Sequence, residues 1–230
     1  MLRSLAIRKT SLIDFPGRVA AVFFLPGCDF RCPYCHNAEL VDLEDPPEGL
    51  TPLEEALAFL ERRKGLLGGL VLSGGEPLLH PEVARIAAAA RGLGLAVKLD
   101  TNGSFPGRIA SVGADYVALD LKTSPGRYGL VAPDLKDSGR LVLESLGAIR
   151  ASGVPFEIRI TCAPGLVGPA DAKAVAEVLE PGDRVYLQPF RPGGCLDPAW
   201  DGLEPLGPAE MAAILETIRA AAPLASIRGA

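Results

Sequence analysis

Short apolar runs alternate along the chain with longer segments whose apolar residues recur at helical spacing. The strand-like runs are Ala20–Leu25, Gly69–Ser73, Ala96–Asp100, Tyr116–Lys122, Phe156–Thr161 and Arg184–Gln188. The helical segments are residues 51 to about 65, Pro81–Arg91, Ser104–Val112, Ser138–Ser152, Pro169–Leu179 and Pro208–Ala221. The first of these begins with Thr51-Pro52-Leu53-Glu54, the sequence of a capping box. Strands that alternate with helices predict βαβ units and a mostly parallel sheet.

Six such units in 230 residues suit either an open barrel or a doubly wound sheet. A complete eight-unit barrel typically takes ~250 residues. The apolar segment Leu5–Ile13 precedes the first unit and is suited to an antiparallel edge strand. Of the open barrel and the doubly wound sheet, we predict the open barrel. The fold is then α/β, an open (β/α)6 partial TIM barrel with a mostly parallel sheet, formed as a single domain over residues 1–230.

Composition narrows the class of protein. The chain is 48% hydrophobic and 22% charged, as ordinary globular proteins are, which excludes a disordered chain or a disulfide-rich miniprotein. The net charge of −5 provides no basic field for nucleic acid or an anionic membrane. No N-terminal run is long enough for a signal peptide or a membrane span. We therefore expect a cytoplasmic protein with neither nucleic acid nor membrane as a partner.

Polar residues collect where the predicted strands end. They are Asp100, Asp120, Lys122, Arg159, Thr161 and Gln188. Because side chains alternate along a strand, Asp120 and Lys122 share a face, and so do Arg159 and Thr161, so polar groups collect on one face of the sheet. The ends of parallel strands and the loops after them build the active sites of such folds. The pattern therefore predicts a polar cavity at this end of the sheet.

Three of the five cysteines, Cys28, Cys32 and Cys35, lie in the loop after the first strand with the spacing C-x3-C-x2-C. Three thiolates on a short loop can hold three corners of a 4Fe–4S cluster, whose usual complement is four cysteines. One iron then stays open to another ligand. A zinc site or a thioredoxin-like pair would use only Cys32 and Cys35 and leave Cys28 unexplained. We expect Cys162 to be an inert core residue.

The segment Gly27–Asn37, with Tyr34 as the aromatic residue, resembles the signature loop of the radical S-adenosylmethionine superfamily. With Ser11–Gly17, it is similar to the activating enzymes of glycyl-radical proteins, above all those of anaerobic ribonucleoside-triphosphate reductases. The resemblance implies one 4Fe–4S cluster and S-adenosylmethionine as cofactors. It also implies formation of a 5′-deoxyadenosyl radical, hydrogen abstraction from a glycine of a partner such as anaerobic ribonucleotide reductase, and flavodoxin or ferredoxin as electron donor.

The same resemblance implies roles for residues beyond the cysteines. Those expected at the cofactor site are Tyr34, His36, Gly74, Gly75, Glu76, Asp100, Asn102, Asp120, Lys122 and Arg159. Gly74-Gly75-Glu76 resembles the motif that contacts the amino group of S-adenosylmethionine. Asp100 and Asn102 share a face and would reach ribose hydroxyls. His36 would support the loop by hydrogen bonding rather than bind iron.

For charge reasons, Asp120 or the cofactor carboxylate is expected to neutralise Lys122, and Arg159 is suited to a carboxylate.

Two other functions fit parts of the pattern. One is a small-molecule radical enzyme resembling 7-carboxy-7-deazaguanine synthase. However, Cys35-His36-Asn37 and Asp120-Leu121-Lys122 are more typical of activating enzymes. The other is an iron–sulfur electron-transfer module without catalysis, against which the polar strand ends argue. No cysteine lies between Cys35 and Gly74, so we expect a single cluster.

Overall fold

The strands pair into one curved sheet whose two edges do not meet. The computed structural model describes residues 2–43 and 47–229. Within that part of the chain the strand order is β3-β1-β2-β4-β5-β6-β7-β8-β9. The strands are β1 (Ser4–Ser11), β2 (Ala20–Leu25), β3 (Thr51–Pro52), β4 (Gly69–Gly74), β5 (Ala96–Thr101), β6 (Tyr116–Asp120), β7 (Phe156–Cys162), β8 (Val185–Pro189) and β9 (Ser226–Ile227). From β2 to β9 all pairings are parallel, whereas β1 runs antiparallel to β2 and β3.

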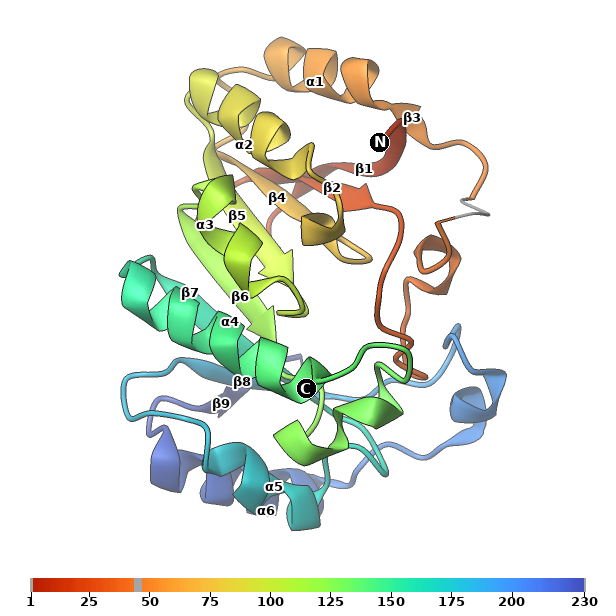
Figure 1. Cartoon of the computed structure of the whole chain (residues 1–230), viewed down its shortest axis with the longest axis vertical. Helices are drawn as coiled ribbons and strands as arrows, with labels where there is room; N and C mark the ends of the chain where they lie inside the picture. The colour runs from red at the N-terminus through yellow and green to blue at the C-terminus, as the bar shows by residue number, and fades with distance from the viewer. Residues whose placement is uncertain (1, 44–46, 230) are drawn as a thin grey trace.

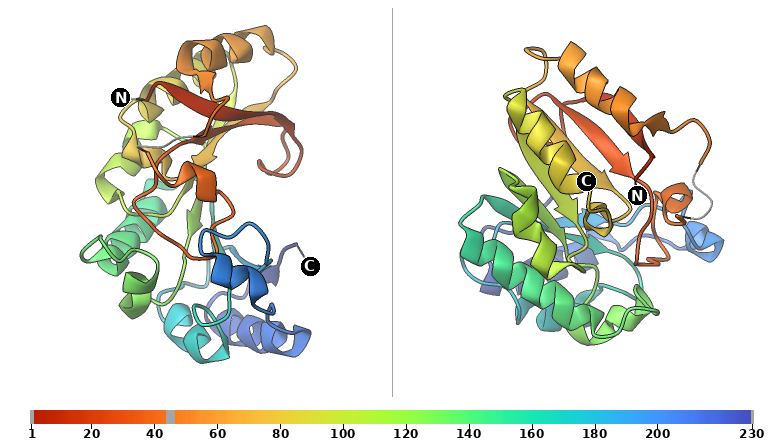
Figure 2. Two further views of the ribbon diagram at one scale, coloured as in Figure 1. Left: turned by 90° about the vertical axis from the view of Figure 1, so that its right-hand side faces the viewer. Right: turned by 45° about the horizontal axis from the view of Figure 1, so that its top comes forward.

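The helices follow the strands and cover the convex side of the sheet (Figures 1 and 2). They are α1 (Leu53–Arg62), α2 (Val83–Gly92), α3 (Ile109–Val112), α4 (Ser138–Ser152), α5 (Pro169–Ala176) and α6 (Pro208–Ala221). Strand residues such as Leu72 and Leu119 pack with helix residues such as Ile86 and Ile149 in the main core, all fully buried. This architecture confirms the open, mostly parallel α/β barrel, and α4 and α6 begin and end where predicted.

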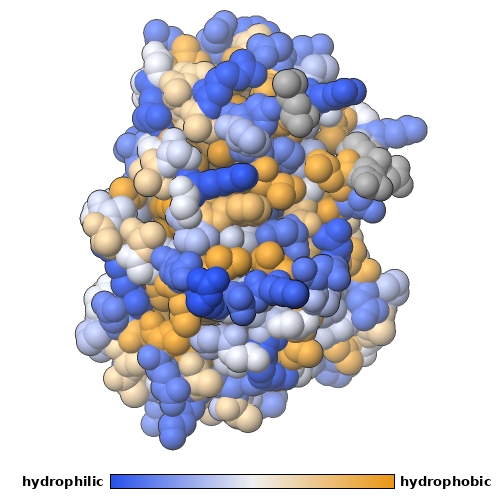
Figure 3. Space-filling model, in the orientation of Figure 1, coloured by the Kyte–Doolittle hydropathy of each residue, from blue (hydrophilic) through white to orange (hydrophobic). Residues whose placement is uncertain are grey.

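The concave side of the sheet carries a second, smaller apolar cluster that includes Phe15, Val22 and Val71. The same side of the sheet also carries the charged residues Lys98 and Asp100 of β5, Asp120 of β6 and Arg159 of β7. The face in Figure 3 shows hydrophobic residues in separate patches among hydrophilic ones. None of the described helices has the length and apolarity to span a bilayer.

Three expectations about local structure were wrong. The capping box at Thr51 does not form, because Thr51 is paired with Leu5 in β3 and the helix begins only at Leu53. The helix expected over Ser104–Val112 is a 3-10 turn at Pro106–Arg108 followed by the short α3. There, Asn102 Oδ1 accepts a hydrogen bond from Ser104 N and holds that segment in a turn. The strand expected to reach Lys122 ends at Asp120, so Lys122 lies in the loop that follows.

Candidate active site

The cysteine loop follows β2 at the carboxyl end of the parallel strands. Its first residues bond to the next segment of the chain, with Gly27 N donating to Leu40 O at 2.7 Å and Cys28 N donating to Val41 O at 3.1 Å. His80 Nε2 lies 2.6 Å from Pro26 O, which only accepts, so the ring nitrogen donates. The start of the loop is therefore fixed by hydrogen bonds to Leu40, Val41 and His80.

A distant segment, residues 191–201, lies against the other side of this loop, as both views in Figure 2 show. Leu196 N donates to Cys35 O and Asp197 N donates to Pro33 O, each at 3.0 Å. His36 Nε2 donates to Arg191 O at 2.8 Å, which confirms the expectation that His36 supports the loop. The segment braces the half of the loop that holds Cys32 and Cys35.

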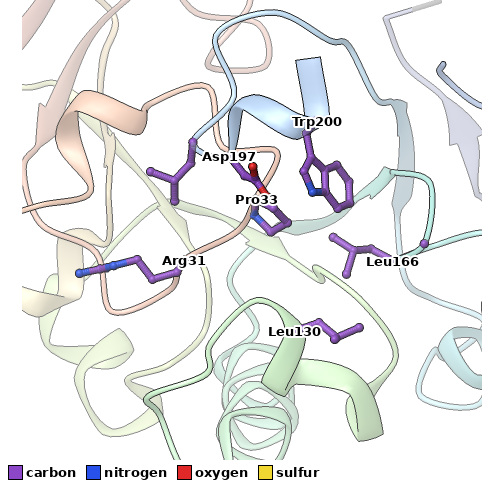
Figure 4. Close-up of a pocket in the computed structure, with 8 residues that line it drawn as sticks. Arg31, Pro33, Leu130, Leu166, Asp197 and Trp200 are labelled. Atoms are coloured by element: carbon purple, nitrogen blue, oxygen red, sulfur yellow. The ribbon is translucent and has the colours of Figure 1, made fainter. Parts of the chain in front are cut away.

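Trp200, to which sequence reasoning gave no role, belongs to the same brace. Its ring lies 6.1 Å from the ring of Tyr34 and 5.8 Å from that of Phe190. A hollow of about 420 Å³ opens beside the loop and is lined by Arg31, Pro33, Leu130, Gly165, Leu166, Leu196, Asp197 and Trp200 (Figure 4). Aromatic packing thus holds the stretch between the second and third cysteines.

The three loop thiols are suited to a cluster. Cys32 is buried, and Cys28 and Cys35 are half-buried. Burial raises the pKa of Cys28 and of Cys32 to about 12. Among the described residues, no three His, Cys, Asp or Glu side chains converge on a single ion. A 4Fe–4S cluster offers a separate iron to each thiolate, so its ligands need not converge on one point.

Buried polar atoms without a partner mark the surroundings of the loop as a place for a ligand. They are Asp29 Oδ2, Tyr34 Oη and Ser104 Oγ. Asn102 links two of these residues: its Oδ1 accepts from Ser104 N, and its Nδ2 donates to Asp29 Oδ1 at 2.9 Å and lies 3.8 Å from Cys28 Sγ. Because buried polar groups are normally hydrogen-bonded, these atoms fit a site completed by cofactors.

Gly74 and Gly75 pack against the cysteine loop. A Cβ on Gly74 would lie 2.3 Å from Leu25 N, and a Cβ on Gly75 would lie 2.1 Å from Gly27 O. Gly75 N donates to Leu25 O, and Asn37 Nδ2 donates to Gly74 O. The sequence was expected to bring backbone close to a ligand at these glycines; in this structure Gly74 lies close to the end of β2 and Gly75 lies close to the loop itself.

Glu76 is fully buried, and its carboxylate is surrounded by donors. It accepts hydrogen bonds from Leu78 N, from Thr101 Oγ1 and from Asn102 N. Burial raises the pKa of Glu76 to about 8, against the lowering effect of those backbone bonds. The side chain thus joins the loop after β4 to the end of β5.

A chain of ion pairs crosses the concave face at the ends of β5, β6 and β7. Arg159 donates from Nη1 to Asp100 Oδ2 at 3.0 Å and from Nε to Asp120 Oδ1 at 2.6 Å. Lys122 Nζ contacts Asp120 Oδ2 at 3.0 Å, and Lys98 Nζ contacts Asp100 Oδ1 at 2.5 Å. This confirms that Asp120 pairs with Lys122 and that Arg159 binds carboxylates, while Lys98 was missed.

The charges in this chain support one another. Burial would raise the pKa of Asp120, but Arg159 and Lys122 hold it well below its usual range. Burial would lower the pKa of Lys122, but Asp120 keeps it well above its ordinary value. Asp100 was expected at ribose hydroxyls; in this structure both of its carboxylate oxygens bind cations, so a ribose would have to share them.

The remaining cysteines lie apart from this chain of ion pairs. Cys162 is fully buried among apolar residues, as expected. Cys195 is buried in the turn beyond β8, where its backbone N donates to Asp201 Oδ1 at 3.0 Å. Neither belongs to a metal-binding group in the part of the chain that the structure describes.

Comparison with known proteins agrees with this geometry. The family model of the radical SAM superfamily matches residues 22–169. The "Putative glycyl-radical enzyme activating enzyme" of Methanocaldococcus jannaschii is 31% identical over 195 residues, which is 81% of this chain and 79% of that protein. The 7-carboxy-7-deazaguanine synthase of Hyperthermus butylicus is 37% identical over 95 residues, 40% of this chain and 38% of that protein.

Among solved structures, the crystal structure of QueE from Escherichia coli shares the fold. Its TM-score is 0.54 at 15% identity, covering 100% of this chain and 93% of that one. The superfamily uses a 4Fe–4S cluster and S-adenosylmethionine, and the thiols and unpartnered polar atoms described above fit both. The matched segment begins in β2 and takes in the cysteine loop, the Gly74-Gly75-Glu76 turn and all five residues of the ion chain. This chain is a member of the radical SAM superfamily.

Proposed function

We propose that this radical SAM enzyme installs a glycyl radical on a partner protein, with anaerobic ribonucleotide reductase as the first candidate. The observation that carries the proposal is the similarity to the activating enzyme of Methanocaldococcus jannaschii, which extends over 81% of this chain. The similarity to the deazaguanine synthase extends over 40%. An activating function therefore accounts for more of the molecule than a small-molecule function does.

Cys28, Cys32 and Cys35 would hold the 4Fe–4S cluster on their loop. When bound, the cluster and S-adenosylmethionine would supply a 5′-deoxyadenosyl radical and methionine, with one electron from a donor such as flavodoxin or ferredoxin. The protein's part is to hold the loop, orient the cofactor and keep water from the reacting centre. The backbone bonds from Leu196 and Asp197 fix the loop against the segment 191–201.

The polar groups of the concave face would orient S-adenosylmethionine. Arg159 and Lys122 would take its methionyl carboxylate, because each keeps a positive charge beside its carboxylate partner. Backbone groups of Gly74 and Gly75 would receive the amino group. Asn102 would contribute near the ribose from the end of β5. Tyr34 would lie at the adenine side of the loop.

The test is anaerobic reconstitution with iron and sulfide, followed by dithionite and S-adenosylmethionine, with and without the partner reductase. Chromatography measures 5′-deoxyadenosine and electron paramagnetic resonance detects the glycyl radical. Cys32→Ala is expected to lose both products. Cys162→Ala, the matched control, removes a thiol that is buried away from the loop and is expected to keep both.

The outcomes separate the functions that the sequence left open. Cleavage coupled to a glycyl signal supports the activating function. Cleavage of S-adenosylmethionine without a glycyl-radical signal on any candidate partner of the same cell would overturn the activating function and favour a small-molecule substrate. A loaded and reducible cluster that cleaves nothing would indicate an electron-transfer module.

A further inference from the structure

Lys98 lies at the inner end of the chain of ion pairs on the concave face. Its side chain is 2% exposed and its ammonium contacts Asp100 Oδ1 at 2.5 Å. Lys122, at the opposite end, is 18% exposed. The chain therefore runs from a closed end at Lys98, through Arg159, to a more open end at Lys122.

The positive and negative charges in this chain of ion pairs do not balance. Lys98, Arg159 and Lys122 are three cations, and among the described residues they form ion pairs with two carboxylates, Asp100 and Asp120. One positive charge is left over among groups that are largely removed from water. Such a charge is costly unless an anion approaches it, so the open end of the chain favours a carboxylate.

Lys98 also determines how Arg159 is divided between Asp100 and Asp120. One oxygen of Asp100 binds Lys98 and the other binds Arg159, while Arg159 Nε binds Asp120. With Lys98 neutral, Asp100 would have Arg159 as its remaining cation in this chain and would attract it more strongly. The guanidinium would then be drawn toward β5 and away from the open end.

We infer that Lys98 is a positioning residue for the methionyl carboxylate of S-adenosylmethionine. It supplies the excess positive charge of the ion chain and holds Asp100 so that Arg159 remains divided between two carboxylates. The inference rests on the proposed placement of that carboxylate at Arg159 and Lys122. If Lys98 only neutralised Asp100 for the sake of folding, its removal would not distinguish ligands with and without a carboxylate.

The experiment measures binding to the cluster-loaded protein without reductant, so that no turnover occurs. Equilibrium dialysis gives the Kd of S-adenosylmethionine and of its decarboxylated analogue, which lacks the carboxylate but keeps the amine and the sulfonium. Lys98→Gln removes the charge and keeps an N–H donor for Asp100. Lys98→Gln combined with Asp100→Asn removes both charges and restores the excess of one.

Lys98→Gln is expected to weaken the binding of S-adenosylmethionine about tenfold. One nearby positive charge shifts the pKa of a carboxyl by about 1–3 units, and a tenfold change corresponds to the low end of that range. Its affinity for the decarboxylated analogue should change less than about threefold. In the double variant the Kd of S-adenosylmethionine should return to within about threefold of the original, since the charge count is restored. Iron content and thermal midpoint confirm that each variant is folded and loaded.

Equal weakening of both ligands by Lys98→Gln would overturn the inference, as would unchanged binding of S-adenosylmethionine. If that variant does not fold, the double variant still decides, because it removes the Lys98–Asp100 pair as a whole and leaves neither member without its partner. Loss of its preference for the carboxylate ligand would also overturn the inference. Neither reductant nor partner protein takes part, so a failure to activate a glycyl-radical partner would be seen separately.

Discussion

The carboxylate of Glu76 accepts a 2.7 Å hydrogen bond from the backbone N–H of Asn102 and so ties the loop after β4 to the end of β5. Thr101 donates its hydroxyl to the same carboxylate. Asn102 in turn reaches the cysteine loop through Asp29. We therefore expect Glu76 to influence the cofactor site through the positions of these loops.

Stability should depend on pH through Glu76. Burial raises its pKa to about 8. Between the ordinary carboxyl pKa and that value, the folded chain keeps a proton that the unfolded chain has lost. The free energy of unfolding therefore falls as pH rises through this window and levels off above it. Glu76→Gln lacks this titration.

The measurement is anaerobic urea unfolding of the cluster-loaded protein and of Glu76→Gln between about pH 5 and pH 9. The stability advantage of the original chain over the variant should shrink by about 4 kcal/mol across that range, since each pKa unit corresponds to ~1.4 kcal/mol. Taking the difference between the two proteins cancels the titration of all other groups. A difference that does not vary with pH would show that Glu76 titrates normally.

Gly75→Ala should displace the cysteine loop. The added methyl would lie 2.1 Å from Gly27 O and 3.2 Å from Cys28 Cβ, and the first of these atoms is backbone. The loop must therefore move, and the thiol of Cys28 moves with it. We expect less than about half of the original iron and sulfide per chain after reconstitution, because cluster ligands tolerate little displacement.

Gly147→Ala is the matched control for this substitution. Gly147 lies in α4, and a Cβ there would meet nothing within 4 Å. Its cluster content should be unchanged and its stability higher by up to about 1 kcal/mol, because alanine favours a helix over glycine. Full cluster content in Gly75→Ala would contradict the proposed contact.

The sequence predicted the elements that depend on local pattern. α4 and α6 have continuous apolar periodicity and lie where expected, and glycine ends α4 at Gly153. Side-chain alternation also placed Asp120 and Arg159 correctly on the concave face. The same alternation rule relates Lys98 to Asp100, so a signal for Lys98 was present in the sequence, although a lysine inside an apolar strand is easily taken for a surface residue.

Other features depend on contacts between distant segments. The capping box at Thr51 does not form because Thr51 pairs with Leu5, which is remote in sequence. Strand β9 has two residues, too few for a periodic pattern, and exists because it pairs with Tyr186 and Leu187 of β8. Such tertiary contacts override local propensity and cannot be found in the local pattern.

Trp200 should report cluster loading. It is the only tryptophan of the chain, and its ring packs on that of Tyr34, which lies between Cys32 and Cys35 in the sequence. Reconstitution should lower its fluorescence by more than about half, because the iron–sulfur cluster would lie within a few residues of the ring. Cys32→Ala, treated identically, should keep its fluorescence. Equal emission from loaded and unloaded protein would place Trp200 away from the cluster.

Arg228 should stabilise the end of the sheet through Glu157. Its guanidinium donates to both carboxylate oxygens of Glu157, at 3.0 and 2.9 Å, and lies 3.3 Å from the ring centre of Tyr186. Glu157 is 1% exposed and also accepts from the hydroxyl of Tyr116. Arg228→Met would leave a buried carboxylate without its cation, which costs about 3–5 kcal/mol when a pair is fully buried.

Because the side chain of Arg228 is 39% exposed, water screens the pair in part, and we expect a loss of about 2 kcal/mol in urea unfolding. Arg228→Met combined with Glu157→Gln should recover most of that loss, since it removes the uncompensated charge while the amide oxygen of the new side chain can still accept from Tyr116. If the double variant were no more stable than Arg228→Met, the contribution of Arg228 would lie in its stacking on Tyr186 and not in the ion pair. The cycle thus separates the two ways in which the final strand could be held against β8.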